Sequence, residues 1–188
     1  MAADIYNLLA GLLSYPGEGY AERIHEALAP IVSRQSASGN ELAEFEEMTR
    51  PMHVRELQEL FIQTFDLNPV CSLEMGWHLF GENYDRGLLL VKMRQQMRAH
   101  GLAETTELPD HLTNGLRLLA RMERHAGAYF AEAIVLPALE KMRQAMAGKD
   151  NPYQHVLEAA RLAVREDFPD LPTRLSIPAG VPELRVLA

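Results

Sequence analysis

Cysteine is almost missing from this sequence of 188 residues, which contains only Cys71. One thiol cannot form a disulfide within the chain, and it cannot supply a zinc site built from several thiolates. Apolar runs of the roughly 18 to 20 residues that span a bilayer are also missing, so any membrane contact would be peripheral or through a partner. The N-terminus has Asp4 where an export signal would have a basic flank. We therefore expect a cytoplasmic protein without membrane insertion.

The sequence patterns of several enzyme classes are lacking too. Neither G-x-G-x-x-G nor G-x-x-x-x-G-K-[ST] occurs, and there is no G-x-S-x-G nucleophile elbow. Basic residues are in deficit, because 26 acidic residues stand against 18 basic ones and give a formal charge of −8. Such a field repels nucleic acid and favours cationic ligands. Nucleotide chemistry, hydrolysis and nucleic-acid binding are thus disfavoured, and we expect no enzyme.

Strand alternation bounded by hairpin turns is absent, whereas apolar residues recur at helical spacing along most of the chain. The predicted fold class is all-α, a single-domain bundle of roughly eight helices over residues 1–168. Prolines predict an extended or disordered tail over residues 169–188. Small polar residues at 33–40 predict a flexible loop. The predicted helices cover residues 5–13, 19–29, 41–48, 54–65, 84–100 (with Leu88, Val91 and Met97 among its apolar positions), 112–122, 129–146 with a kink at Pro137, and 152–164.

The most informative stretch runs from Glu107 to Leu112 and contains Pro109, Asp110 and His111. Proline suits the first turn of a helix, and carboxylates there face the positive end of the helix dipole. The stretch therefore predicts a helix start. A titratable imidazole beside a carboxylate makes it a candidate binding site as well.

Aromatic residues are few and concentrate at Trp77, Phe80 and Tyr84. They can simply fill the core, or some of them can lie along a groove. In the second interpretation, an aromatic floor and an acidic rim would accept an apolar helix that bears arginines. The rim would consist of Asp66, Glu82, Asp85, Glu107 and Asp110.

The alternative function is a metal-dependent helical-bundle enzyme. A di-iron site of the bundle type needs Glu-x-x-His pairs on two helices, and only Glu22 with His25 has that spacing. A lone pair of this kind is typical of a solvated helix face. A third hypothesis is a helical adaptor without any link to molybdenum.

Four fragments together resemble the NarJ-type nitrate reductase assembly chaperones of the TorD/DmsD family of redox-enzyme maturation proteins. The resemblance covers roughly residues 5–125, and Phe61 departs from it because many relatives have tyrosine there. The fragments are Leu12 to Pro16, Leu57 to Leu67, Gly81 to Gly87 and Glu107 to Leu112.

The resemblance implies a chaperone that binds the twin-arginine-type leader peptide of a molybdenum oxidoreductase catalytic subunit. It would assist insertion of bis-molybdopterin guanine dinucleotide into that client, in contact with cofactor-biosynthesis proteins, without binding a cofactor stably itself. We expect a monomer, with a domain-swapped dimer as the alternative. The client can be nitrate reductase or a related dehydrogenase or reductase. The expected peptide-binding residues are Asp110, His111, Glu107, Pro109, Phe65, Asp66, Trp77, Phe80, Tyr84, Asp85 and Arg86.

Overall fold

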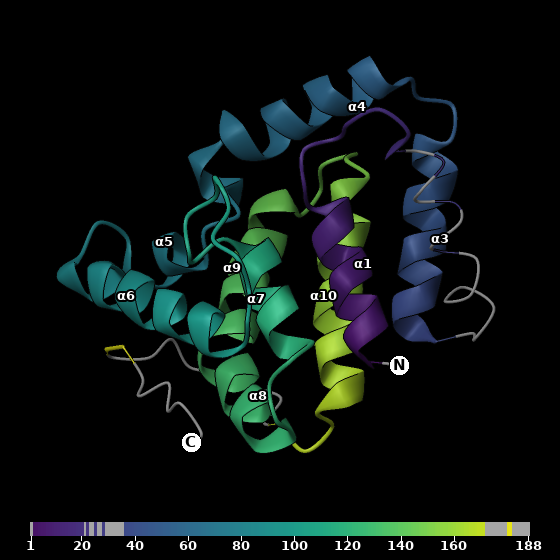
Figure 1. The fold of residues 1–188 in the computed structure, drawn as a ribbon. Helices are drawn as coiled ribbons and strands as arrows, with labels where there is room; N and C mark the ends of the chain where they lie inside the picture. Colours follow the sequence, from purple (N-terminus) through teal and green to yellow (C-terminus); the bar gives the residue numbers. More distant parts are fainter. Residues whose placement is uncertain are drawn as a thin grey trace.

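Helices account for the architecture of the computed structural model, which describes residues 2–20, 22, 25, 28, 36–171, 180 and 181 (Figure 1). The all-α prediction is confirmed, since the one extended feature within these ranges is an isolated β-bridge between Glu74 and His111. The helices are α1 (Ala2–Leu12), α3 (Ala37–Thr49), α4 (Val54–Phe61), α5 (Met75–Phe80), α6 (Tyr84–Ala99), α7 (Leu112–Leu119), α8 (Arg124–Phe130), α9 (Leu136–Met146) and α10 (Tyr153–Asp167), with π-helical turns η1 (Ile62–Asp66) and η3 (Ala131–Val135) and a 3-10 turn η2 (Pro69–Cys71).

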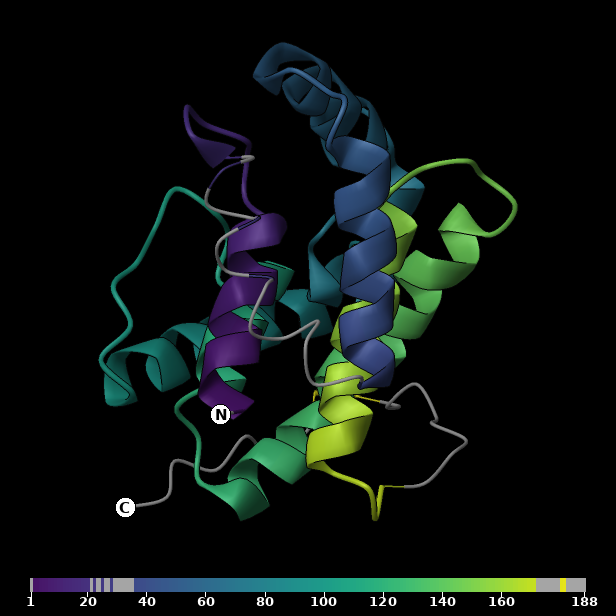
Figure 2. The same ribbon diagram turned by 90° about the vertical axis from the view of Figure 1, so that its right-hand side faces the viewer.

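The bundle is organised around α10, which packs against α3, α9 and α1, while α1 packs in turn against α7. Figures 1 and 2 show α1, α3 and α10 side by side, with α4 across one end of the bundle. Helices α5 and α6 extend to one side of it, and α5 contacts both α6 and α9. The site described below lies where this extension joins the bundle.

The start of α3 corrects the prediction of a flexible loop at residues 33–40, because residues 37–40 are helical. The Ser36 hydroxyl accepts a hydrogen bond from the Gly39 N–H, so Ser36 caps the helix. In addition, the Glu166 carboxylate accepts from the N–H and the hydroxyl of Ser38. Small polar residues here satisfy a helix N-terminus instead of forming a loop. Residues 33–35 lie outside the described part.

Two predicted helices are interrupted by π-helical turns. The predicted helix 54–65 is confirmed as α4 followed by η1, where the Leu67 N–H donates to the Ile62 carbonyl at 2.9 Å. The helix predicted over 129–146 contains a second such turn, η3, which immediately precedes α9, and Pro137 lies in the first turn of α9. Such turns often occur at functional sites, and η1 ends at the pocket described below.

The outward face of α6 differs from the predicted one. Leu88 and Val91 are exposed, whereas Leu89, Met93 and Met97 are buried. Apolar and polar residues alternate around this helix so evenly that periodicity did not identify the packed face.

Some predictions fall partly or wholly outside the described residues. The helix predicted at 19–29 is one, since most of its residues are not described. Phe168 is buried and Leu171 packs against the core, so the boundary of the predicted tail remains a prediction. Over the described ranges, no helix combines the length and apolar character that a membrane span requires.

Candidate functional site

A β-bridge ties the segment before α5 to the segment before α7. The Met75 N–H donates to the Asp110 carbonyl at 2.9 Å, and the Leu112 N–H donates to the Leu73 carbonyl at 2.8 Å. These two bonds flank the antiparallel pair of Glu74 and His111. In such a pair the two facing side chains lie close together on the same side of the backbone. The bridge therefore presents one acid and one imidazole together.

His111 is the N-cap of α7, which begins at Leu112, where the predicted helix over 112–122 also begins. Its Nδ1 accepts from the Thr113 N–H and lies 2.7 Å from the Thr113 hydroxyl oxygen. The helix start is thus confirmed in kind, but Pro109 lies in the preceding turn instead of the first helical turn. Because Nδ1 accepts, the ring proton belongs on Nε2, which lies 3.9 Å from the Glu107 carboxylate.

Burial lowers the pKa of His111 from its ordinary 6.5 to about 4, although Glu74 opposes this and Arg117 adds to it. The imidazole is therefore neutral at physiological pH, as its capping role requires. A desolvated cation at a helix N-terminus would be unfavourable on both counts.

We expect His111 to make stability fall with acid. Its folded pKa lies below its unfolded one, so its contribution is complete above pH 6.5 and is lost as pH falls toward 4. The full loss is about 3 kcal/mol of unfolding free energy. Urea unfolding at pH 7 and pH 4.5 gives the unfolding free energy of the parent and of His111→Gln at each pH. The parent should lose more unfolding free energy between the two pH values than His111→Gln does. An NMR titration in which the His111 imidazole becomes protonated with a midpoint near pH 6.5 would contradict this prediction.

Asp110 lies beneath the bridge and is wholly buried. Its Oδ2 accepts from the Gly76 N–H and from Arg86 Nε, both at 3.2 Å. Burial raises the pKa of Asp110, although Arg86 and the Gly76 N–H lower it in part. A Cβ on Gly76 would lie 2.6 Å from the same carboxylate oxygen. The carboxylate thus fixes the start of α5 and one residue of α6.

A pocket of about 500 Å³ opens beside the bridge. Three carboxylates, one imidazole and one guanidinium face it together with apolar side chains. Its lining residues are Phe65, Asp66, Pro69, Ser72, Leu73, Glu74, Trp77, Arg86, Glu107, Leu108 and His111. The helical segment α4–η1, the bridge, α5, α6 and the loop before α7 all contribute, so the pocket exists only in the folded chain.

The pocket acids repel one another. Burial raises the pKa of Asp66, and Glu74 raises it further. Burial also raises the pKa of Glu107, with further raising by Asp66 and Glu74. A cationic group in this pocket would relieve that repulsion, so the electrostatics favour a basic ligand.

One wall of the pocket contains an aromatic ring and a cation. The Arg86 guanidinium lies over the Trp77 ring at 5.7 Å from its centroid. The indole N–H of Trp77 donates to the Pro69 carbonyl at 3.0 Å. Leu108 lines the pocket and is exposed, and the exposed Leu67 and Val70 directly follow the lining residues Asp66 and Pro69 in the sequence. The surface thus offers both acidic and apolar contacts.

Six of the eleven predicted site residues line this pocket: Phe65, Asp66, Trp77, Arg86, Glu107 and His111. The other five do not line it: Asp110 and Pro109 are buried in the turn behind, Phe80 packs on the core, and Tyr84 and Asp85 start α6.

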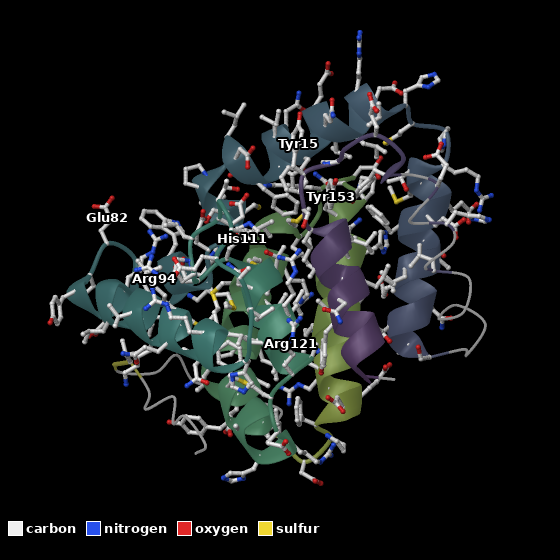
Figure 3. The ribbon with its side chains drawn as sticks, in the orientation of Figure 1. Tyr15, Glu82, Arg94, His111, Arg121 and Tyr153 are labelled. Carbon is white, nitrogen blue, oxygen red and sulfur yellow. The ribbon has the colours of Figure 1, made fainter. Side chains whose placement is uncertain are left out.

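Sequence reasoning missed five lining residues, Pro69, Ser72, Leu73, Glu74 and Leu108. Glu74 matters most because it faces His111 across the bridge. One signal could have indicated it: an acid placed between Leu73 and Met75 within an apolar cluster. Glu82, proposed for the rim, points away at the tip between α5 and α6 (Figure 3).

Metal ligands do not converge in the described part of the chain, where no three His, Cys, Asp or Glu side chains are grouped to hold an ion. His25, half of the candidate Glu-x-x-His pair, has its Nδ1 2.6 Å from the Glu46 carboxylate. The three pocket acids do not meet the requirements of such a group either.

Comparison with known proteins agrees with the resemblance of the four fragments. The nitrate reductase molybdenum cofactor assembly chaperone NarJ of Escherichia coli (strain K12) is 29% identical over 119 residues, which cover 61% of this chain and 50% of that protein. The matched region thus spans about half of that relative. A probable chaperone of the same name from Bacillus subtilis (strain 168) is 27% identical over 168 residues, or 86% of this chain and 91% of that protein. The model of the nitrate reductase delta subunit family matches residues 33–168. The chain therefore belongs to the nitrate reductase delta subunit family.

Proposed function

We propose that this protein is a cytoplasmic assembly chaperone that binds the N-terminal, twin-arginine-type segment of a molybdenum oxidoreductase catalytic subunit. It assists insertion of the bis-molybdopterin guanine dinucleotide cofactor into that client and holds no cofactor itself. It acts as a monomer, before the client reaches its membrane partner or is exported. The names of its relatives support the assembly role.

The observation that supports peptide binding is the pocket beside the bridge. Asp66, Glu74 and Glu107 supply negative charge. Leu108 in the lining supplies exposed apolar surface, and Leu67 and Val70, which follow the lining residues Asp66 and Pro69 in the sequence, are exposed as well. A segment in which arginine precedes an apolar helical stretch matches this pair of surfaces, since arginine suits carboxylates and a helix face suits an apolar surface.

Isothermal titration calorimetry with synthetic N-terminal segments tests the proposal. The segments come from the nitrate reductase catalytic subunit and from related molybdenum oxidoreductases, each paired with a copy in which glutamine replaces arginine. We expect one native segment to bind and its glutamine copy to bind at least about tenfold more weakly. If no native segment binds, or if the glutamine copy binds equally well, the proposal is wrong.

Glu74→Gln is expected to weaken binding of the native segment by about tenfold and to reduce its salt dependence. The substitution removes one pocket charge while it keeps the side-chain length. Glu82→Gln is the matched control, because Glu82 is an exposed acid outside the pocket. Calorimetry at two salt concentrations measures both variants. Equal affinities for the two variants would contradict the role of Glu74.

A further inference from the structure

The pocket contains a cation of its own. Arg86 lines it together with Glu74 and Glu107. Its Nε nevertheless donates to Asp110, which lies behind the pocket wall, and only one fifth of the side chain is exposed. The Trp77 ring supports the guanidinium from one side. The Nε–H of Arg86 is therefore committed to Asp110, although the side chain borders the acidic pocket.

Among the described residues, Arg86 forms its ion pair with Asp110 and with none of the three pocket acids. The pKa values of Asp66 and Glu107 are raised by burial and by neighbouring acids, although a guanidinium lines the same pocket. The Arg86 charge acts on Asp110 instead, whose pKa it lowers against the effect of burial. The buried Asp110 carboxylate thus holds both the Gly76 N–H and the Arg86 guanidinium.

We infer that Asp110 is a positioning residue that withholds the Arg86 guanidinium from the pocket carboxylates, which leaves them free for a cationic side chain of the bound segment. This inference rests on the proposed function of the pocket. It assigns recognition of the cation to Asp66, Glu74 and Glu107. Asp110 is fully buried and does not contact the ligand itself; its role is to hold Arg86.

Loss of the Asp110 charge should turn Arg86 into an intramolecular competitor. A buried guanidinium without its partner is unfavourable, and the nearest relief is a charge-assisted bond to a carboxylate of the pocket that it already lines. The long side chain can redirect its planar head without moving α6. The ligand's cation would then have to displace Arg86.

The test compares three variants by calorimetry with the native segment that binds the parent. Asp110→Asn keeps the shape and an acceptor for the Gly76 N–H, and we expect it to weaken binding by about tenfold or more. Asp110→Asn with Arg86→Met removes the competitor and should restore affinity to within about threefold of the parent. Asp110→Asn with Arg94→Met is the matched control, because Arg94 lies on the same helix and pairs with Glu104 (Figure 3). That control should remain weak.

A second readout needs no ligand. NMR titration of side-chain carboxyl groups should show the pKa values of Asp66 and Glu107 falling in Asp110→Asn and returning to parent values when Arg86→Met is added. A purely structural role for Asp110 would not produce this reversal. Circular dichroism confirms that each variant is folded. If Asp110→Asn alone does not fold, the Asp110→Asn, Arg86→Met variant decides, since it leaves no unpaired charge buried.

The outcomes separate this inference from the proposed function. Parent-like binding by Asp110→Asn overturns the inference, as does weak binding by the folded Asp110→Asn, Arg86→Met variant. If no native segment binds the parent, the proposed function fails, and the carboxyl titration alone judges the position of Arg86. Unchanged pKa values of Asp66 and Glu107 in Asp110→Asn would then overturn the inference as well.

Discussion

Gly76→Ala is expected to lower the unfolding free energy by about 3 kcal/mol and to abolish binding at the pocket. The added Cβ would lie 2.6 Å from Asp110 Oδ2, and 3.1 Å from side-chain carbons of Arg86 and Leu89. Neither the buried carboxylate nor its partners can retreat without breaking the bonds that fix the start of α5. Urea unfolding followed by circular dichroism measures the loss, and calorimetry measures binding.

Gly87→Ala is the matched control for this prediction. Gly87 lies within α6, and nothing lies within 4 Å of the position that its Cβ would take. Alanine favours the helix at such a site, so we expect stability to rise by up to about 1 kcal/mol. Equal effects of the two substitutions would show that the contact between Gly76 and Asp110 is not as tight as the structure describes.

Tyr153→Ala is expected to lower the unfolding free energy by about 3 to 5 kcal/mol. Tyr153 is fully buried at the start of α10, and its ring centroid lies 5.5 Å from that of Phe45, 5.7 Å from Phe61 and 5.0 Å from Phe65 (Figure 3). Removing the ring leaves a cavity at the centre of this cluster. Because Phe65 also lines the pocket, binding should weaken as the wall loosens.

Tyr153→Phe separates the ring from the hydroxyl. It keeps every aromatic contact, and we expect a change of no more than about 1 kcal/mol. Urea unfolding of both variants provides the comparison. A Tyr153→Phe variant as unstable as Tyr153→Ala would show that the hydroxyl, not ring packing, holds this part of the core.

The fold class could be predicted from the sequence because helical periodicity and turn residues act locally. The apolar stripe from Leu57 to Phe65 is a local feature of this kind. Local reasoning failed where the outcome depends on neighbours far along the chain. The residues after Ser36 became helical with help from Glu166, which no local pattern indicates.

The candidate site was predicted in part for the same reason. The stretch Glu107 to His111 is recognisable as a segment, and it does border the pocket. The roles of the residues within this stretch depend on which of them are buried, and composition does not show that. Asp110 accepts a hydrogen bond from Arg86 inside the protein, and burial keeps His111 neutral. Glu74 escaped notice because only the bridge brings it opposite His111.

The bridge between Glu74 and His111 also divides the chain topologically. The two backbone hydrogen bonds of the bridge close a loop of the chain between Glu74 and His111. The base of this loop, here called the stem, borders the pocket, and the rest of it, here called the arc, contains α5, α6 and the connection to α7. Loop-closure entropy grows only slowly with length, so the arc can lengthen or shorten at small cost while its stem stays closed. Residues on the arc but outside the pocket, such as those around Glu82 and Thr105, are therefore the natural places for insertions. Variation there can add contacts to a larger client without disturbing the charges at the stem.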